Sequence, residues 1–296
     1  MTANGLSAVD QRIVSARSLL FVPGDRPDRV EKALRSGADG IIVDLEDAVR
    51  SDRKGLARAT VEAMGARLGA ERSPVVLVRV NPFGTADFVS DVKAAIAGDA
   101  DGLVLSKFVP GDATSGADAA IAAAEAIAGR KARVPVIGLI ESAAGVHALS
   151  SVADFPARVL RLAFGAADLH ADLRLSYRAD GPHTVHAMVS LAIASAAASL
   201  PEPLDSPHFA LGDEEGLVSR ARRARDFGFG GVLCIHPNQV PLVHAEFGIT
   251  PAERSWAVRI LEAWDGVSAE PEGAIRLDGE LVDEAMVRRA RQIVAD

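Results

Sequence analysis

The chain has 296 residues, is 49% hydrophobic and 24% charged, and carries a formal net charge of −8. These values exclude a disordered chain and argue against nonspecific binding to nucleic acid or to an anionic membrane surface. A single cysteine, the lack of an apolar N-terminal segment, and the lack of any apolar stretch of about 18 residues predict a cytoplasmic protein with no membrane partner.

Eight short apolar runs recur along the chain. Most are continuous rather than alternating, which is typical of parallel strands covered on both faces. In chain order they are residues 18–24, 40–47, 75–81, 102–107, 134–142, 158–169, 203–209 and 231–237.

Stretches with helical periodicity lie between these runs. They are residues 26–37, 53–69, 86–98, 116–129, 183–200 and 214–228. Eight strand-helix units predict a (β/α)8 TIM barrel over residues 1–250. A doubly wound open sheet is the alternative, but it rarely needs eight parallel strands, and no G-x-G-x-x-G follows the first run.

The last 46 residues, 251–296, fall outside the eight units. A helix is predicted over 251–266, then a short hairpin "GAIRLDGELVD" that turns at Asp278 and Gly279, then a helix over 284–295. We expect this extension to act as a lid or as an oligomerisation arm.

Polar side chains end almost every predicted strand. A TIM barrel carries its chemistry at the carboxyl ends of its strands, so these side chains are expected to gather at one mouth. They are Asp44, Glu46, Arg79, Asn81, Lys107, Glu141, Asp168, Asp205, His208 and His236.

Two of these carboxylates, Glu141 and Asp168, end adjacent strands and predict a shared Mg²⁺ ion, which binds to one or two carboxylates and completes its shell with water and substrate oxygens. The alternative is that each caps a neighbouring helix. Arg79 is predicted to hold a substrate carboxylate or developing oxyanion. Its alternative is an ion pair with an acid of the second strand. Asp44 and Glu46 are in phase along that strand, so both are expected to orient Arg79 or a metal-bound water.

Further substrate-binding candidates follow the first strand. Arg26, Arg29 and Lys32 lie along the start of a predicted helix, where basic groups and free N–H groups suit a phosphate. The alternative is a solvated charged face. Phe21 in the first strand and His236 at the end of the eighth are also predicted to contact substrate.

Seven motifs in order resemble the HpcH/HpaI aldolase and citrate lyase β-subunit family. They are "LLFVPG", "GADGIIVDLEDAV", "VRVN", "GLVLSK", "IGLIES", "FGAADL" and "GFGGVLCIHPNQV". The resemblance implies a TIM barrel, Mg²⁺ dependence, and cleavage or formation of a carbon–carbon bond in a β-hydroxyacyl thioester.

The resemblance also implies roles for individual residues. Glu141 and Asp168 match the metal ligands, and Arg79 matches the arginine that binds the substrate's carboxylate and carbonyl oxygen. The tail "LDGELVDEAMVRRA" is similar to the C-terminal lid of the malyl-CoA and citramalyl-CoA lyase branch. There Asp283 matches a catalytic aspartate that reaches a neighbouring subunit, which implies a trimer or hexamer. Ser106 and Val232 depart from the family's pattern.

These observations predict a lyase that converts malyl-CoA, citramalyl-CoA or a similar ester to acetyl-CoA and a 2-keto acid. Three alternatives stay open. They are a citrate lyase β subunit acting on citryl-acyl carrier protein, a malyl-CoA thioesterase, and a non-catalytic metabolite-binding protein.

Overall fold

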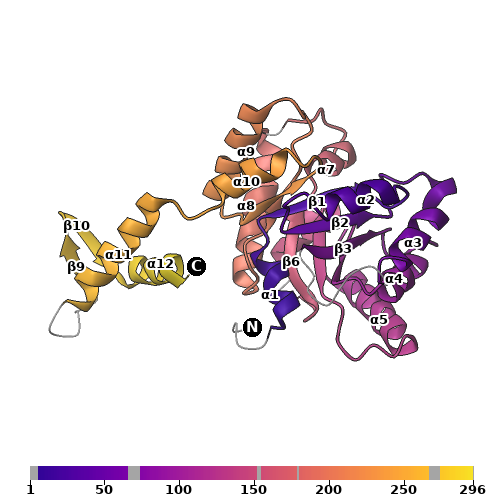
Figure 1. Cartoon of the computed structure of the whole chain (residues 1–296). Helices are drawn as coiled ribbons and strands as arrows, with labels where there is room; N and C mark the ends of the chain where they lie inside the picture. Colours follow the sequence, from indigo (N-terminus) through magenta and orange to yellow (C-terminus); the bar gives the residue numbers. More distant parts are fainter. Residues whose placement is uncertain (1–5, 66–73, 152–154, 179, 267–273, 296) are drawn as a thin grey trace. The chain divides into compact units, whose positions relative to one another are not determined.

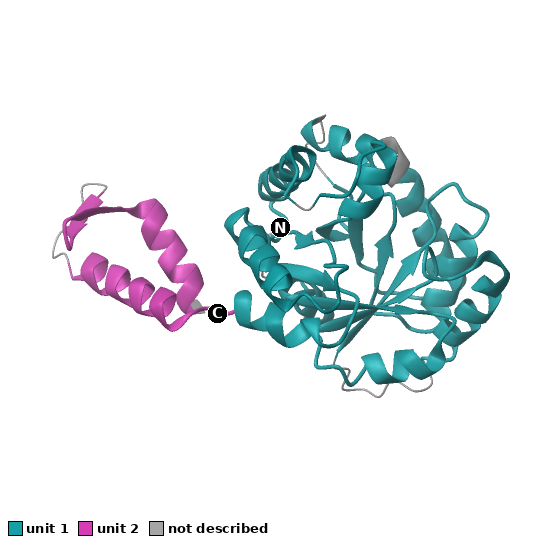
Figure 2. Ribbon diagram, turned by 90° about the horizontal axis from the view of Figure 1, so that it is seen from above, with its two compact units in different colours: residues 1–247 teal, residues 248–296 magenta. Residues whose placement is uncertain are grey.

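A computed structural model of the chain describes residues 6–65, 74–151, 155–178, 180–266 and 274–295. The chain divides into two compact units, residues 1–247 and 248–296 (Figure 2). Each unit has its own core and is described by itself.

The larger unit is a closed barrel of eight parallel strands in sequence order (Figure 1). The barrel closes where Ser18 of the first strand pairs with Val232 of the eighth. The predicted TIM barrel is therefore confirmed. Its strands are β1 (Ser18–Pro23), β2 (Gly40–Asp44), β3 (Val75–Val80), β4 (Gly102–Leu105), β5 (Val136–Ile140), β6 (Val159–Phe164), β7 (Leu204–Asp205) and β8 (Gly231–Cys234).

Helices surround these strands in both ribbon views (Figures 1 and 2). Except for α1, the helices that contribute buried side chains to the outer core pack on the outer side chains of the strands. They are α1 (Ala8–Ser15), α2 (Pro27–Ala33), α3 (Lys54–Glu62), α4 (Phe88–Ala97), α5 (Asp112–Ile127), α6 (Ala143–Ala148), α7 (Ala166–Asp172), α8 (Pro182–Ala197), α9 (Glu214–Asp226) and α10 (Gln239–Glu246), with 3-10 turns η2 (Ser51–Arg53) and η3 (Leu149–Ser151).

A second core fills the interior of the barrel. Inward side chains such as Leu77 and Leu139 form it, together with Ile13 of α1 and Ala16, which follows α1. Arg161 is wholly buried and donates hydrogen bonds to the carbonyl of Ala16 (2.5 Å) and to that of Glu202 (2.6 Å). The sequence analysis did not predict α1, which packs against this inner core.

The predicted boundaries are wrong at several elements. β7 has only two residues, Leu204–Asp205, where a strand over 203–209 was expected, because Pro203 and Pro207 lack the N–H that a ladder needs. α2 ends at Ala33 rather than at residue 37. The helix expected over 53–69 is shorter, since α3 begins at Lys54, directly after η2, and ends at Glu62.

The smaller unit is a helix, a hairpin and a helix: α11 (Pro251–Asp265), β9 (Ala274–Leu277), β10 (Glu280–Asp283) and α12 (Glu284–Ala295). Thr250 and Glu253 form a capping box at the start of α11. The hairpin turns at Asp278 and Gly279, both with positive φ (52° and 89°), as the Asp-Gly pair predicted. Apolar side chains from α11, β10 and α12 form a separate core.

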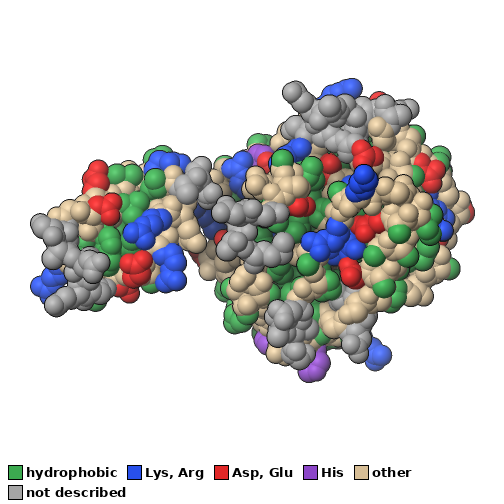
Figure 3. Space-filling model, turned by 90° about the horizontal axis from the view of Figure 1, so that it is seen from below, with side chains coloured by type: hydrophobic (Ala, Val, Ile, Leu, Met, Phe, Trp, Pro, Cys, Tyr) green, Lys and Arg blue, Asp and Glu red, His purple; other side chains and the backbone are tan. Residues whose placement is uncertain are grey.

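No helix in the described part of the chain is long and apolar enough to cross a bilayer. On the face drawn in Figure 3, Lys and Arg side chains are interspersed with Asp and Glu side chains.

Candidate active site

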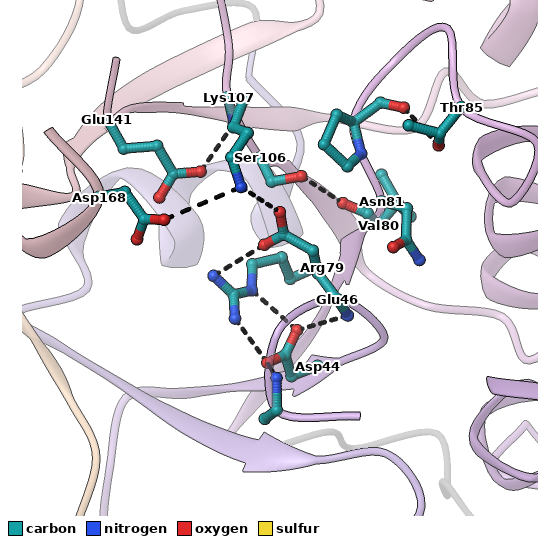
Figure 4. A network of polar contacts seen from close by, with 12 residues as sticks. Asp44, Glu46, Arg79, Val80, Asn81, Thr85, Ser106, Lys107, Glu141 and Asp168 are labelled. Atoms are coloured by element: carbon teal, nitrogen blue, oxygen red, sulfur yellow. Dashed lines mark hydrogen bonds and ion pairs between the residues drawn. The ribbon is translucent and has the colours of Figure 1, made fainter. Parts of the chain in front are cut away.

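Charged side chains from the carboxyl ends of five consecutive strands meet in one cluster (Figure 4). They come from β2 and β3, from the residues that follow β2, β4 and β5, and, for Asp168, from the first turn of α7 after β6. The topology thus brings together groups far apart in the sequence. We call this set the acidic cluster: Asp44, Glu46, Arg79, Lys107, Glu141 and Asp168.

Arg79 is held by both acids of β2 and the following loop. Its Nε and Nη2 donate to the two carboxylate oxygens of Asp44 at 2.8 and 2.6 Å, and its Nη1 lies 3.0 Å from Oε2 of Glu46. Burial would lower the pKa of Arg79, but the hydrogen bonds and charge of Asp44, with Glu46, raise it. The ring of Phe21 lies beneath the guanidinium, 4.8 Å from Cζ to the ring centroid. The ion pair that was the alternative role for Arg79 is therefore observed, and it fixes the guanidinium in place.

Lys107 was predicted to lie at the mouth of the barrel, but the sequence analysis gave it no role. Its Nζ lies 3.0 Å from Oε1 of Glu46 and 3.8 Å from Oδ1 of Asp168. Its backbone has a positive φ of 49°, and its N–H donates to Oε1 of Glu141 at 2.7 Å. The sequence shows a lysine at a strand end, but the left-handed turn that places this one among the acids is visible only in the structure.

Glu141 is a buried carboxylate of the acidic cluster and is only 2% exposed. Burial, together with the negative charges of Glu46 and Asp168, raises its pKa to about 8. The capping alternative for Glu141 is wrong, because Ser142 is the N-cap of α6 and accepts the N–H of Gly145 at 3.0 Å.

The side chain of Glu141 packs directly against Gly165, which has no Cβ to obstruct it. A Cβ on Gly165 would lie 2.4 Å from Cβ and 2.6 Å from Oε2 of Glu141. Any side chain at Gly165 would therefore collide with the carboxylate.

The charges of the acidic cluster suit a divalent cation. Its four carboxylates face two cationic side chains, so two negative charges remain when all are ionised. Glu141 follows β5, and Asp168 lies after β6. Two carboxylates are enough for Mg²⁺, because water and substrate oxygens complete its coordination shell. Among the described residues, no group of three or more His, Cys, Asp or Glu side chains could hold a metal without such help.

The predicted phosphate site on α2 is not supported. Arg26 pairs with the neighbouring Asp28 (3.1 Å) at the surface, and Arg29 is exposed. Lys32 lies in the last turn of this seven-residue helix, away from the free N–H groups at its start. His236 is half-buried, and its Nδ1 accepts the backbone N–H of Asn238 (3.2 Å), so it stabilises the turn after β8.

The prediction that the polar groups at the strand ends all gather at one mouth is wrong for β7. Asp205 of β7 is buried in a two-point ion pair with Arg220 of α9, at 2.8 and 2.9 Å. His208 lies 3.2 Å from Asp213 in the loop that follows. These groups join β7 to the outer helices.

Asp283 belongs to the smaller unit. It is exposed at the end of β10, and its Oδ1 accepts the backbone N–H of Met286 at 3.0 Å. The carboxylate therefore caps α12, whatever further role it has.

Comparison with known proteins places the chain and its fold in one family. The family model described as HpcH/HpaI aldolase/citrate lyase matches residues 17–237, most of the chain. The chain belongs to this family. The resemblance seen in the sequence is therefore confirmed, as is the expectation of an enzyme of the carbon–carbon lyase class.

The chain is similar to relatives that have different activities. The chain is 32% identical to a (3S)-malyl-CoA thioesterase of Cereibacter sphaeroides, over 94% of this chain and 93% of the other. It is 31% identical to the L-malyl-CoA/β-methylmalyl-CoA lyase of Rhodobacter capsulatus, with the same coverage. Protein CitE of Mycobacterium tuberculosis, solved with magnesium, acetoacetate and coenzyme A, is 30% identical with a TM-score of 0.77, covering 95% of this chain and 97% of CitE.

Proposed function

We propose that this protein is a Mg²⁺-dependent lyase that cleaves a β-hydroxyacyl-CoA thioester to acetyl-CoA and a 2-keto acid. The observation that carries the proposal is the buried Glu141 beside Asp168, in a cluster whose carboxylates exceed its cations. The magnesium and coenzyme A in CitE and the activity of the R. capsulatus relative support it.

Glu141 and Asp168 would hold the metal. When bound, Mg²⁺ supplies Lewis-acid stabilisation of negative charge on the substrate's oxygens, an effect of several kcal/mol. Lys107 faces the same space and would add positive charge there. Its ammonium already lies beside Asp168 and Glu46.

Arg79 is preorganised to bind the oxygens of the hydroxy-acid half. Asp44 and Glu46 hold its guanidinium still, so no reorganisation accompanies the reaction. Glu46, whose pKa is raised chiefly by burial, is suited to accept the hydroxyl proton of the substrate.

In the proposed cleavage step, one C–C bond of the substrate breaks and one C=O bond forms. The hydroxyl O–H bond breaks and its electron pair forms the C=O of the keto acid. The adjacent C–C bond breaks, and its electron pair passes to the thioester enolate. A proton added to the enolate carbon then gives acetyl-CoA.

Asp283 is proposed to supply that last proton from a neighbouring subunit. The tail's similarity to the malyl-CoA and citramalyl-CoA lyase branch supports this role, and so does the exposure of Asp283 on a separate unit. The role requires a homo-oligomer, a trimer or a hexamer, because one copy then completes the site of another.

The test is release of products from malyl-, citramalyl- and other β-hydroxyacyl-CoA esters, with Mg²⁺ and with EDTA. We expect acetyl-CoA and a keto acid from at least one ester, abolished by EDTA and restored by added Mg²⁺. Metal-independent turnover, or no cleavage of any ester by folded protein, would overturn the proposal.

A thioesterase is the second candidate, favoured by the 32% identity to the C. sphaeroides enzyme. It would release free CoA and an intact hydroxy acid, so the same assay distinguishes it by its products. A citrate lyase β subunit would instead need an acyl carrier protein, and the purified chain would leave free CoA esters uncleaved. A non-catalytic binding protein would turn over neither kind of thioester.

A further inference from the structure

An apolar pocket opens beside the acidic cluster, at the carboxyl ends of β3 and β4. Its volume is about 150 Å³. Phe83, Phe88 and Phe108 line it together with the smaller apolar side chains of Leu105, Val109 and Ala117. Three polar residues, Asn81, Ser106 and Lys107, complete the wall.

Lys107 joins this pocket to the proposed active site. Its side chain reaches Glu46 and Asp168, and its backbone N–H binds Glu141, yet the residue also lines the pocket. The two spaces therefore share a wall, and a ligand held at the acidic cluster has an apolar recess next to it.

Specific packing contacts hold the aromatic rings of the pocket wall in place. Phe83 and Phe88 meet edge to face, with centroids 5.3 Å apart at 84°. Phe88 is buried, whereas Phe83 is 46% exposed at the rim. A Cβ on Gly116 would lie 2.7 Å from Cζ of Phe83, so the glycine of α5 lets that ring lie close to the helix.

Hydrogen bonds fix the loop that carries Phe83. The backbone N–H and side-chain Nδ2 of Asn81 both donate to Oδ2 of Asp91, at 3.0 and 2.6 Å. Asp91 is wholly buried and also pairs with Arg58 (2.9 Å). The pocket is therefore preformed, as small-molecule sites usually are.

We propose that this pocket binds an apolar substituent on the hydroxyl-bearing carbon of the substrate, and so selects esters bulkier than malyl-CoA. This inference rests on the proposed lyase function and names its substrate class. An apolar cavity of about 150 Å³ accommodates benzene. The substituent is therefore an alkyl or phenyl group of up to about six carbons, which leaves on the keto acid after cleavage.

The test runs the reaction toward condensation. Acetyl-CoA, Mg²⁺ and a 2-keto acid are supplied, the keto acid being glyoxylate, pyruvate, 2-oxohexanoate or phenylglyoxylate, so that the substituent grows from hydrogen to butyl or phenyl. We expect kcat/KM to be at least about 10-fold higher for the butyl or phenyl acid than for glyoxylate.

Two variants change the pocket. Ala117→Leu fills the pocket. It should lower the ratio of kcat/KM for the butyl or phenyl acid to kcat/KM for glyoxylate by about 10- to 100-fold. Phe83→Ala, at an exposed position where folding is not at risk, should lower the ratio for the phenyl acid about 5-fold through the lost ring contact. Phe209→Ala is the matched control, since Phe209 is similarly exposed (51%) but lies outside the pocket, and its ratio should equal that of the wild type.

The outcomes separate this inference from the function on which it rests. If glyoxylate reacts best and Ala117→Leu leaves the ratio unchanged, the pocket is not a substrate site although the lyase stands. If no keto acid reacts, the lyase function fails, and calorimetric binding of the same acids with Mg²⁺ decides the pocket. Tighter binding of bulky acids by wild type than by Ala117→Leu would then support it, and equal binding would overturn it.

Discussion

Arg79 and Asp44 face each other across β3 and β2 as register partners and form a buried two-point ion pair, at 2.8 and 2.6 Å. The carboxylate of Asp44 also accepts the backbone N–H groups of Glu46 and Ala48, at 2.8 and 3.0 Å. This pair therefore joins two strands, orders the loop after β2, and aims the guanidinium into the acidic cluster.

Removing Asp44 should destabilise the protein. Asp44→Ala leaves a buried guanidinium with Glu46 as its remaining partner, so we expect the free energy of unfolding in urea to fall by about 3 kcal/mol. Asp52→Ala, which breaks the exposed pair between Arg50 and Asp52, should change it by less than about 1 kcal/mol. An equal decrease in the free energy of unfolding of the two variants would show that the buried pair stabilises the fold no more than the exposed one.

Arg79→Lys tests the two-point geometry rather than the charge. A lysine keeps the positive charge but cannot donate to both oxygens of a carboxylate, so we expect kcat/KM for ester cleavage to fall about 100-fold or more. Arg222→Lys alters an exposed pair with Glu246 on the outer helices and should retain full activity. An Arg79→Lys enzyme with normal kinetics would remove Arg79 from the proposed mechanism.

Glu141 should make the metal-free protein less stable as pH rises. Its pKa in the native state is raised from 4.5 to about 8, so the native state keeps a proton that the unfolded chain releases. The stabilisation is present below pH 4.5 and is lost as pH rises through about 8. The wild-type minus Glu141→Gln difference in unfolding free energy, measured with EDTA across this range, should decline with pH. A flat difference would contradict the shifted pKa.

The same protonation should govern metal affinity. Because Mg²⁺ requires the ionised carboxylate, its affinity should rise about 10-fold per pH unit below pH 8 and level off above it. Calorimetric titration of Mg²⁺ at several pH values measures this slope. Glu141→Gln should bind Mg²⁺ weakly at every pH.

Gly165→Ala should disrupt the metal site through a single methyl group. The added Cβ would lie 2.4 Å from Cβ of Glu141, so the carboxylate must move and Mg²⁺ affinity should fall about 10-fold or more. Gly55→Ala places the same methyl group on α3 with no atom within 4 Å and should raise stability by about 1 kcal/mol without altering Mg²⁺ binding. Normal Mg²⁺ binding by Gly165→Ala would indicate that Glu141 is not a ligand.

The sequence allowed the fold to be predicted well because most strands are continuous apolar runs with a polar residue at the end. The Asp278-Gly279 turn was predicted for a similarly local reason, since few residue pairs accept positive φ at both positions. The lengths of β7 and α2 were predicted wrongly. Prolines and helix-end residues act over two or three positions, and a periodic pattern is too long to locate such a boundary.

The site was predicted in part. Glu141, Arg79 and Asp44 could be chosen because acids and arginines at the ends of apolar strands are uncommon except near a ligand. Lys107 was expected at the mouth but without a role, because the left-handed backbone turn that places its ammonium beside Glu46 and Asp168 is not visible in the sequence. Asp205 was wrongly included, because its partner Arg220 lies on a helix whose packing the sequence does not specify.

The sequence by itself thus determined the eight-unit architecture and the residue types at the strand ends, since periodicity and strand termini are local properties. Only the tertiary structure decided which of those residues meet, because that depends on register across the barrel, as for Asp44 and Arg79. It also revealed the aromatic pocket beside Lys107, whose walls come from β3, α4, β4 and α5 and exist only once these elements pack together.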